Sequence, residues 1–358
     1  MSAGGLVRRR VILEVPEAWF VNPSDGDRHR LFYTSLLAAL AELGMLIDPV
    51  WLPRGAERAP RPSDPSDLII SFHSYGEAAG NMLRCKESYI PPFYSLDPMG
   101  YACFSQLATR PELYRDTIAA KDQGAATRFR ENLARDLRRQ NRSKYPQPDP
   151  TDDATEAGQV FVPLQMLNDS VAKGAWLDQS EALRTVIGAA SARGLHTVIK
   201  RHPRCTSTGV ARLLSELSRQ RGITVSTRSI HSLIEGAALV VGANSGVLFE
   251  ALIQGKPVIS YAASDFATIT QQVQSHADLA GAIAAPAPLD PGWRDRFLLW
   301  YLTDYCVRAN DVPAIRRHIR AALERTYLPG STSEMWRPSY QRGLYLFSLI
   351  DRIKRRLF

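Results

Sequence analysis

The sequence is poor in cysteine and has no long hydrophobic run. Its four cysteines, at positions 85, 103, 205 and 306, show neither CxxC spacing nor a nearby histidine cluster. This pattern argues against a disulfide framework and against a structural zinc site, so we expect buried thiols in a reducing compartment. No segment approaches the roughly 20 apolar residues of a spanning helix, and the apolar run near the N-terminus is too short for a signal peptide. We therefore expect a cytoplasmic protein.

The sequence also lacks internal repeats, low-complexity tracts and any zinc-finger, RNA-binding or homeodomain signature. The net charge is +8, but the basic residues are scattered, so the charge favours an acidic substrate or an anionic membrane face over nucleic acid. With 45% hydrophobic and 22% charged residues, the composition is globular. A chain of 358 residues is long for one compact core and predicts two domains.

The stretch Thr197–Tyr261 organises the chain. It contains three short apolar strands separated by helical segments, namely Thr197–Lys200, Ala238–Gly242 and Pro257–Tyr261. This βαβ rhythm predicts part of a parallel sheet. Ligands of open α/β sheets bind outside the carboxyl ends of the strands, so we expect a binding site where these strands end.

An earlier part of the chain repeats the same plan. Strands are predicted at Arg10–Glu14, Ile47–Leu52 and Asp67–Phe72, with a helix at Leu31–Leu43. The proline-rich stretch Pro146–Ala157 is typical of an interdomain linker. We therefore predict an α/β protein with a Rossmann-like domain over residues 1–150 and a second one over residues 158–335.

Two polar insertions at the predicted strand ends suit a phosphate. The backbone N–H groups at the start of the helix Val247–Gln254 favour an anion, and Glu250 in that helix is suited to a ribose diol. The alternative is that Ser245 only caps the helix, that Glu250 is solvated and that His202 is a satisfied loop residue. The candidate nucleotide-binding residues are Lys200, Arg201, His202, Pro203, Asn244, Ser245, Gly246 and Glu250.

Two further segments contribute candidate site residues. The strand Gly158–Leu164 is followed by Gln165 and Asp169, and an aspartate at such a strand end faces the cleft, although it is also a common helix cap. The aromatic segment Lys86–Ser105 either packs beneath the cleft or contacts an acceptor. Its polar candidates are Lys86, Tyr89, Asp97 and Tyr101.

These motifs together resemble the bacterial capsule polysaccharide synthesis glycosyltransferases. The similar segments are His202-Pro203 followed by NSGVLFEALIQGKPV, the upstream KESYIPPFYSLDPMGYACFS and VPLQMLNDS. The resemblance implies a GT-B fold, in which two Rossmann-like domains face each other across a cleft and the last helix, here residues 339–358, crosses back to the first domain. The sequence departs from this family in two ways: it has a single short catalytic unit where several relatives carry two, and it has Ala262-Ala263 where relatives often have glycine.

The resemblance also implies an activity. It is the metal-independent, retaining transfer of 3-deoxy-manno-octulosonic acid (Kdo) from its CMP-activated form to a lipid-linked surface polysaccharide, without a cofactor. Asp169 would be the nucleophile, or the base if the reaction inverts, and Gln165 stands on the same strand end. His202, with Lys200 or Arg201, would offset charge on the departing phosphate.

Alternatives to this activity stay open from the sequence. Glu250 would serve a UDP- or GDP-sugar donor equally well, and the chain could instead be a non-catalytic subunit for polysaccharide assembly. The C-terminal stretch has apolar residues at helical spacing, which suit packing against the first domain. Its basic residues also permit peripheral contact with an anionic inner membrane.

Overall fold

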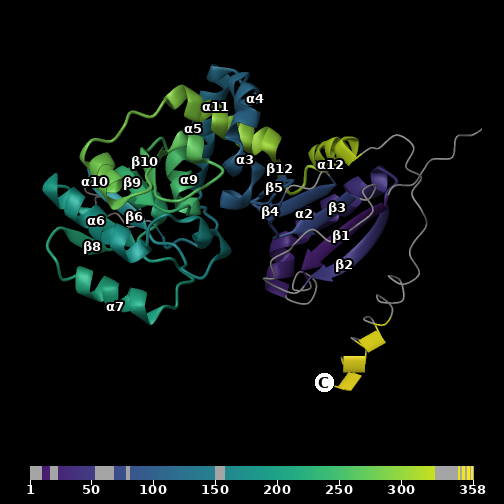
Figure 1. Ribbon diagram of the computed structural model, residues 1–358, viewed down its shortest axis with the longest axis horizontal. Helices are drawn as coiled ribbons and strands as arrows, with labels where there is room; N and C mark the ends of the chain where they lie inside the picture. The colour runs from purple at the N-terminus through teal and green to yellow at the C-terminus, as the bar shows by residue number, and fades with distance from the viewer. Residues whose placement is uncertain are drawn as a thin grey trace, which may run out of the picture.

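The described residues form two six-stranded sheets with helices on their faces (Figure 1). The computed structural model describes residues 10–16, 23–52, 68–77, 81–149 and 158–326, together with seven residues between positions 346 and 357.

The first sheet has the strand order β12-β5-β4-β3-β1-β2. Strands β1 to β4 run parallel to one another, β5 is antiparallel to β4, and β12 is antiparallel to β5. Its core strand β3 is buried along its whole length, as expected for a strand covered on both faces. The bounds are β1 (Arg10–Pro16), β2 (Leu46–Leu52), β3 (Leu68–Phe72), β4 (Met82–Glu87), β5 (Phe93–Asp97) and β12 (Cys306–Arg308).

The second sheet is parallel throughout, with the order β11-β10-β9-β6-β7-β8. The chain runs outward from β6 through β7 and β8 and then returns to β9 on the other side of β6. This reversal is the strand order of a dinucleotide-binding Rossmann sheet, and ligands bind at such a switch point. The bounds are β6 (Gln159–Pro163), β7 (Thr197–Lys200), β8 (Ile223–Val225), β9 (Ala237–Gly242), β10 (Val258–Ser260) and β11 (Gln271–Gln272).

The helices follow the expected alternation with strands. Several begin with a side-chain cap, such as Asp178 before α6 and Ser207 before α7. The α-helices are α2 (Pro23–Glu42), α3 (Gln106–Thr109), α4 (Arg115–Ala119), α5 (Gln123–Arg139), α6 (Gln179–Ala192), α7 (Thr208–Leu217), α8 (Ile230–Gly236), α9 (Gly246–Ile253), α10 (His276–Ala284), α11 (Pro291–Trp300) and α12 (Val312–Thr326). Short 3-10 helices include η1 (Ala102–Phe104) and η3 (Ser170–Gly174), and the π-helix η5 (Tyr301–Tyr305) extends α11.

The fold class predicted from the sequence, α/β with two Rossmann-like sheets, is confirmed by these strand orders. The chain crosses back to the first sheet earlier than expected, because β12 pairs with β5 and α12 packs against α2. Both elements lie within the range predicted for the second domain. A three-residue strand after a π-helix carries no pattern from which the sequence could have indicated this return.

The last helix was expected to pack on the first domain, but much of residues 339–358 lies outside the described residues. The described side chains of this segment are exposed; they are Leu346, Leu349, Ile350, Ile353, Lys354, Arg356 and Leu357.

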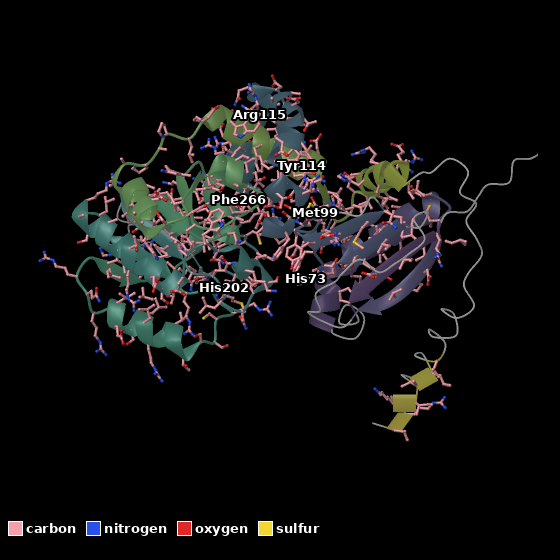
Figure 2. All side chains as sticks on the ribbon, viewed as in Figure 1. His73, Met99, Tyr114, Arg115, His202 and Phe266 are labelled. Carbon is pink, nitrogen blue, oxygen red and sulfur yellow. The ribbon has the colours of Figure 1, made fainter. Side chains whose placement is uncertain are left out.

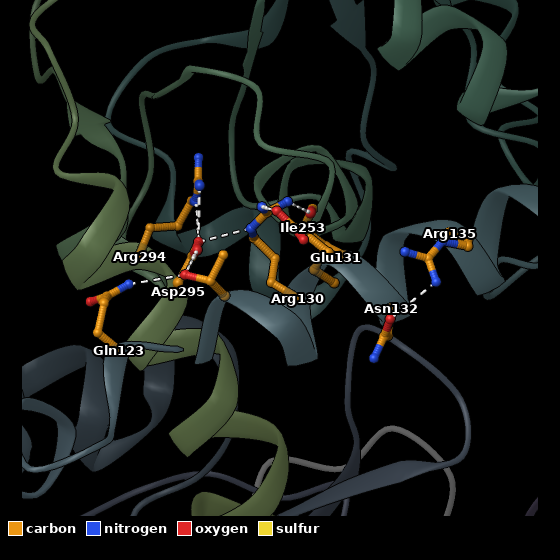
Figure 3. A network of polar contacts seen from close by, with 9 residues as sticks. Gln123, Arg130, Glu131, Asn132, Arg135, Ile253, Arg294 and Asp295 are labelled. Atoms are coloured by element: carbon orange, nitrogen blue, oxygen red, sulfur yellow. Dashed lines mark hydrogen bonds and ion pairs between the residues drawn. The ribbon is translucent and has the colours of Figure 1, made fainter. Parts of the chain in front are cut away.

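We call the parts of the molecule built on the first and second sheets its first and second halves. Helix α5 joins the second half through a buried ion-pair network (Figure 3). Asp295 on α11 contacts Arg130 Nε at 2.9 Å and accepts a hydrogen bond from Thr127 at 2.9 Å. The Arg130 guanidinium also donates to the carbonyl of Ile253 at the end of α9, at 3.3 Å. These contacts fix α5, which precedes the linker predicted from the sequence, against α9 and α11.

The two halves share one aromatic core. Ile90 and Phe93 from the first half pack in the same buried cluster as Phe249 and Tyr301. The ring of Tyr89 stacks on that of Phe249, with centroids 5.0 Å apart. Burial of aromatic rings contributes large apolar areas to packing, so this cluster fixes how the halves meet.

A second contact between the halves leaves no room for a side chain. A Cβ atom added at Gly174 in η3 would lie 2.7 Å from the Cβ of Cys103 in η1. We predict that Gly174→Ala lowers the free energy of unfolding by about 1–3 kcal/mol, because overpacking forces the backbone to shift.

The matched control is Gly188→Ala in the interior of α6, where an added Cβ meets nothing within 4 Å. It should raise the free energy of unfolding by about 0.5–1 kcal/mol, since alanine is the better helix former. Urea unfolding of both variants measures the difference, and equal effects at the two sites would contradict the prediction.

Candidate functional site

A cavity of about 1200 Å³ lies where the strands of the second sheet end and the first half faces them. Its lining comes from the loops after β6, β7, β9 and β10 and from segments of the first half. Figure 2 shows His202 on the side of the second sheet and His73 on the side of the first. All residues that the sequence analysis proposed as a site line this cavity, with the exception of Asp97.

Asp169 follows β6 and is exposed. It caps η3, where its carboxylate accepts from the backbone N–H of Val171 at 3.4 Å and from the hydroxyl of Ser170 at 3.3 Å. The Ser170 hydroxyl is in turn 2.8 Å from the hydroxyl of Tyr101. Asp169 is therefore a helix cap and a cavity residue at once, and these contacts fix its backbone at the mouth of the cavity.

Gln165 and Asn244 form a buried amide pair. The Gln165 side chain donates to Asn244 Oδ1 at 2.8 Å, and Asn244 Nδ2 donates to the carbonyls of Val171 at 3.0 Å and Ala263 at 2.9 Å. The pair thus joins the loops that follow β6, β9 and β10. These hydrogen bonds give Gln165 a positioning role in the structure, at the base of the loop that carries Asp169.

His202 follows β7 and is half-buried. Its Nδ1 accepts the backbone N–H of Arg204 at 3.1 Å, so the neutral ring carries its proton on Nε2. Burial lowers the pKa of His202, and the charge of Asp169 acts in the opposite direction. The edge of the ring meets Tyr145 with centroids 5.1 Å apart. A neutral imidazole with an Nε2 proton is a hydrogen-bond donor suited to an anion.

The two cationic side chains beside His202, Lys200 and Arg201, donate hydrogen bonds to nearby backbone carbonyls. Lys200 Nζ donates to the carbonyls of Thr227 at 3.0 Å and Arg228 at 2.5 Å, and burial lowers the pKa of this lysine. Arg201 donates to the carbonyl of Ser207 at 2.9 Å. Both line the cavity, as does Pro203, but their charged groups hold the turns after β7 and β8.

The start of α9, where the sequence predicts an anion site, lines the cavity. Ser245 caps the helix by accepting the backbone N–H of Val247 at 3.3 Å, and Gly246 opens the first turn. Farther along, Glu250 is only 2% exposed, and its Oε1 accepts from the Ser143 hydroxyl at 2.6 Å. Burial raises the pKa of Glu250 to about 8, opposed by the Ser143 hydrogen bond and the charge of Lys144. Glu250 is therefore not the solvated residue that the alternative from sequence described.

Three of the four candidates in the aromatic segment reach the cavity. Lys86 lies over the ring of Tyr101, 5.7 Å from its centroid. Tyr89 donates to Asp265 at 2.6 Å. Asp97 is instead fully buried and accepts from the backbone N–H groups of Met99, Gly100 and Gln106 and from the hydroxyl of Tyr305. Asp97 therefore holds its own loop, and the structure places it outside the cavity.

Sequence reasoning missed several cavity residues. Ser143, Lys144 and Tyr145 line the cavity just before the stretch that the sequence indicated as a linker, and Pro146, Gln147 and Pro148 within it do so too. The lysine and tyrosine next to the prolines were the available signal. Asp265, after β10, was also missed; burial raises its pKa to about 6, opposed by hydrogen bonds from Tyr89 and Tyr301.

The strand orders and the cavity at the strand ends define an α/β protein of the GT-B type. Residues 118–284 match the family described as "Capsule polysaccharide biosynthesis protein". This match confirms the resemblance drawn from VPLQMLNDS, the HP motif and the NSG segment, which lie within it; the motif at Lys86–Ser105 lies outside. The match covers a little under half of the chain, and its description names capsule polysaccharide biosynthesis.

Solved structures that match this chain include two from Thermosulfurimonas dismutans. The KpsC beta Kdo 2,4 transferase is 17% identical over 81% of this chain and 90% of that one, with a TM-score of 0.49. The KpsC beta Kdo 2,7 transferase is 17% identical over 87% and 99%, with a TM-score of 0.48. A glycosyltransferase from Rickettsia africae is 9% identical over 90% and 100%, with a TM-score of 0.37. No curated protein sequence matches this chain.

Within the described residues, no group of three or more histidine, cysteine, aspartate or glutamate side chains is arranged to hold a metal ion.

The raised pKa of Glu250 predicts a pH effect on stability. The carboxyl loses its proton at about pH 8 in the folded protein but near its ordinary value of 4.5 when unfolded. The folded state therefore binds more protons between these values, and its stability falls as the pH rises through them. Glu250→Gln removes this titration. Its free energy of unfolding should therefore rise relative to that of the wild type between pH 5 and pH 8, by at most about 1.4 kcal/mol for each unit by which the pKa is raised.

Urea unfolding of both proteins at pH 5 and pH 8 measures this change. Glu216→Gln, on an exposed position of α7, is the matched control and should leave the pH dependence unchanged. A Glu250→Gln variant with the same pH dependence as the wild type would contradict the prediction.

Proposed function

We propose that this protein is a glycosyltransferase that moves Kdo from CMP-Kdo to a growing lipid-linked surface polysaccharide. The observation that carries the proposal is the placement of Asp169 and His202. They follow the adjacent strands β6 and β7, line one cavity and interact electrostatically. In this proposal, a nucleophile or base and a hydrogen-bond donor to the phosphate stand at the ends of adjacent strands, and the start of α9, suited to an anion, follows β9 across the switch point.

In this proposal, a carboxylate oxygen of Asp169 attacks the anomeric carbon while the bond from that carbon to the phosphate oxygen breaks. The electron pair leaves with CMP, whose charge is offset by the Nε2 proton of His202 and by the N-terminus of α9. The acceptor hydroxyl then attacks the same carbon, loses its proton to a base and releases Asp169. Two inversions retain the configuration, and the offset phosphate charge makes a metal unnecessary.

In this proposal, the other candidate site residues have different roles according to where they lie in the cavity. Gln165 positions the loop that carries Asp169, and Asn244, Ser245 and Gly246 form the anion site. The buried carboxyl of Glu250 faces the cavity where a ribose would lie. Lys86, Tyr89 and Tyr101 form the acceptor side.

We predict that Asp169→Asn abolishes transfer while donor binding survives. Asparagine keeps the helix cap but is a far weaker nucleophile, so the loss falls on the transition state, and turnover should drop by several orders of magnitude. Release of CMP from CMP-Kdo measures turnover, and calorimetric titration measures binding. Wild-type protein incubated with donor alone should gain the mass of one sugar on the peptide that contains Asp169.

Asp178→Asn is the matched control, since Asp178 also caps a helix, by accepting from Ser180 and Glu181, and lies outside the cavity lining. It should keep wild-type turnover. Full activity in Asp169→Asn would end the catalytic role. Lost activity without a trapped sugar would assign Asp169 as the base of an inverting reaction. If the protein releases UDP or GDP from the corresponding nucleotide sugars instead of CMP from CMP-Kdo, the donor is a UDP- or GDP-sugar. If it releases no nucleotide, a non-catalytic subunit is favoured.

We further propose that the protein acts in the cytoplasm and touches the anionic inner membrane through its C-terminal segment. Within the described residues, no helix is both long and apolar enough to span a bilayer. Leu346, Leu349, Ile350, Ile353 and Leu357 are exposed, helical and spaced to share one side of a helix, with Lys354 and Arg356 among them. Apolar side chains beside basic ones suit the surface of an anionic bilayer, where a lipid-linked acceptor would be held.

The variant Ile350→Glu with Ile353→Glu should therefore reduce binding to vesicles that contain phosphatidylglycerol by about tenfold or more. Leu113→Glu, at an exposed leucine of the first half, is the control and should bind normally. Vesicle co-sedimentation measures both. Equal binding of all three proteins, or equal binding to neutral phosphatidylcholine vesicles, would contradict membrane contact of this kind.

A further inference from the structure

The segment Ser143–Pro148 forms a wall of the cavity that no strand-end motif predicted. It is tied to the second half of the molecule at both ends. Asn141 donates to the carbonyl of Pro148 at 2.7 Å and accepts from the Ser229 hydroxyl at 2.6 Å, and Gln147 accepts the backbone N–H of Ile230 at 3.0 Å. These bonds hold the segment as an ordered part of the site.

Two residues of this wall contact the residues that the proposed function assigns to the nucleotide. The hydroxyl of Ser143 donates to Glu250 at 2.6 Å. The ring of Tyr145 meets the ring of His202 edge-on at 5.1 Å. The residue between them, Lys144, also lines the cavity.

Lys144 is also the link from this wall to the first half. Its Nζ donates to the carbonyl of Ser88 at 3.3 Å and lies 3.4 Å from Oε2 of Glu87. Its charge lowers the pKa of both Glu250 and His202, which places it within electrostatic reach of both.

The other lysines that line the cavity, and Arg201 in the turn after β7, are placed differently. Lys200 and Arg201 hold backbone carbonyls around that turn. Lys86 and Lys173 lie over the rings of Tyr101 and Tyr75, on the side of the first half. An ammonium on a flexible stem can keep one partner while it binds an anion, because it has three donors.

We propose that Lys144 is the lysine that binds the phosphate of the nucleotide donor, in place of Lys200 and Arg201. The inference rests on the proposed function, since it takes the nucleotide to lie between His202 and Glu250. Because Glu87 and Ser88 belong to the first half, a phosphate bound by Lys144 would also connect both halves of the molecule around the donor.

The experiment compares a nucleotide with its nucleoside, which differ by the phosphate alone. Calorimetric titration of the full chain measures the affinities of CMP and cytidine for the wild type, Lys144→Met, Lys144→Arg and Lys121→Met. Lys121 pairs with Asp304 at 2.7 Å outside the cavity lining and is the matched control. Lys144→Met should weaken CMP binding by about 10- to 100-fold, the range for losing a hydrogen bond to a charged group, and change cytidine binding by less than about twofold.

Lys144→Arg, which keeps the charge, should retain most of the CMP affinity, and Lys121→Met should behave as the wild type. A purely structural lysine would weaken CMP and cytidine equally, and an unchanged ratio of the two affinities in Lys144→Met would overturn the proposal. Should Lys144→Met fail to fold, as judged by circular dichroism, Lys144→Gln takes its place under the same criteria.

The same titrations separate this inference from the proposed donor. If the wild type binds UDP or GDP and not CMP, the choice of CMP fails, and the comparison of that nucleotide with its nucleoside still decides the role of Lys144. A wild-type protein that binds none of these nucleotides overturns both proposals.

Discussion

The geometry of the site depends on the buried amide pair of Gln165 and Asn244. Parallel strands bring their carboxyl ends to one edge of the sheet, but they do not fix the loops beyond that edge. The Asn244 amide does so by bonding Gln165 and the carbonyls of Val171 and Ala263. Buried amides leave costly unpaired groups when they lose a partner, so the three loops hold one another in place. This pair therefore holds the loop that carries Asp169 and so fixes the position of Asp169 at the cavity.

A second constraint acts between the halves. Tyr89 from the first half donates to Asp265 of the second at 2.6 Å, and Tyr301, in the segment that leads back to the first sheet, donates to it at 2.9 Å. Both rings also pack against Phe249, on the helix whose N-terminus faces the cavity. The start of α9 and the aromatic segment around Tyr89 are thus built on one packed core, so the separation between them is set by aromatic contacts and not by a loose linker.

Much of the site could be predicted from residue types at strand ends. The apolar runs of β6, β7 and β9 identify buried parallel strands, and the polar residues that follow them must meet at one edge of the sheet. That reasoning places Asp169, His202, Asn244 and Ser245 together. It does not reveal hydrogen-bond partners, such as the backbone carbonyls to which Lys200 and Arg201 donate. Asp97 looked like a cleft residue for the same reason, although its carboxylate is enclosed by three backbone N–H groups and a tyrosine hydroxyl.

The sequence by itself determined the α/β class, the strands β6, β7, β9 and β10 of the second sheet and the two insertions that face the cavity, because hydrophobic periodicity and capping are local properties of the chain. Only the tertiary structure decided that β12 returns to the first sheet, that Ser143–Pro148 walls the cavity and that Glu250 is buried. Each of these depends on contacts between residues far apart in the chain, such as Ser143 with Glu250 and Cys306 with Ser95. Burial and pairing of this kind arise from the packing of whole elements, which no local pattern records.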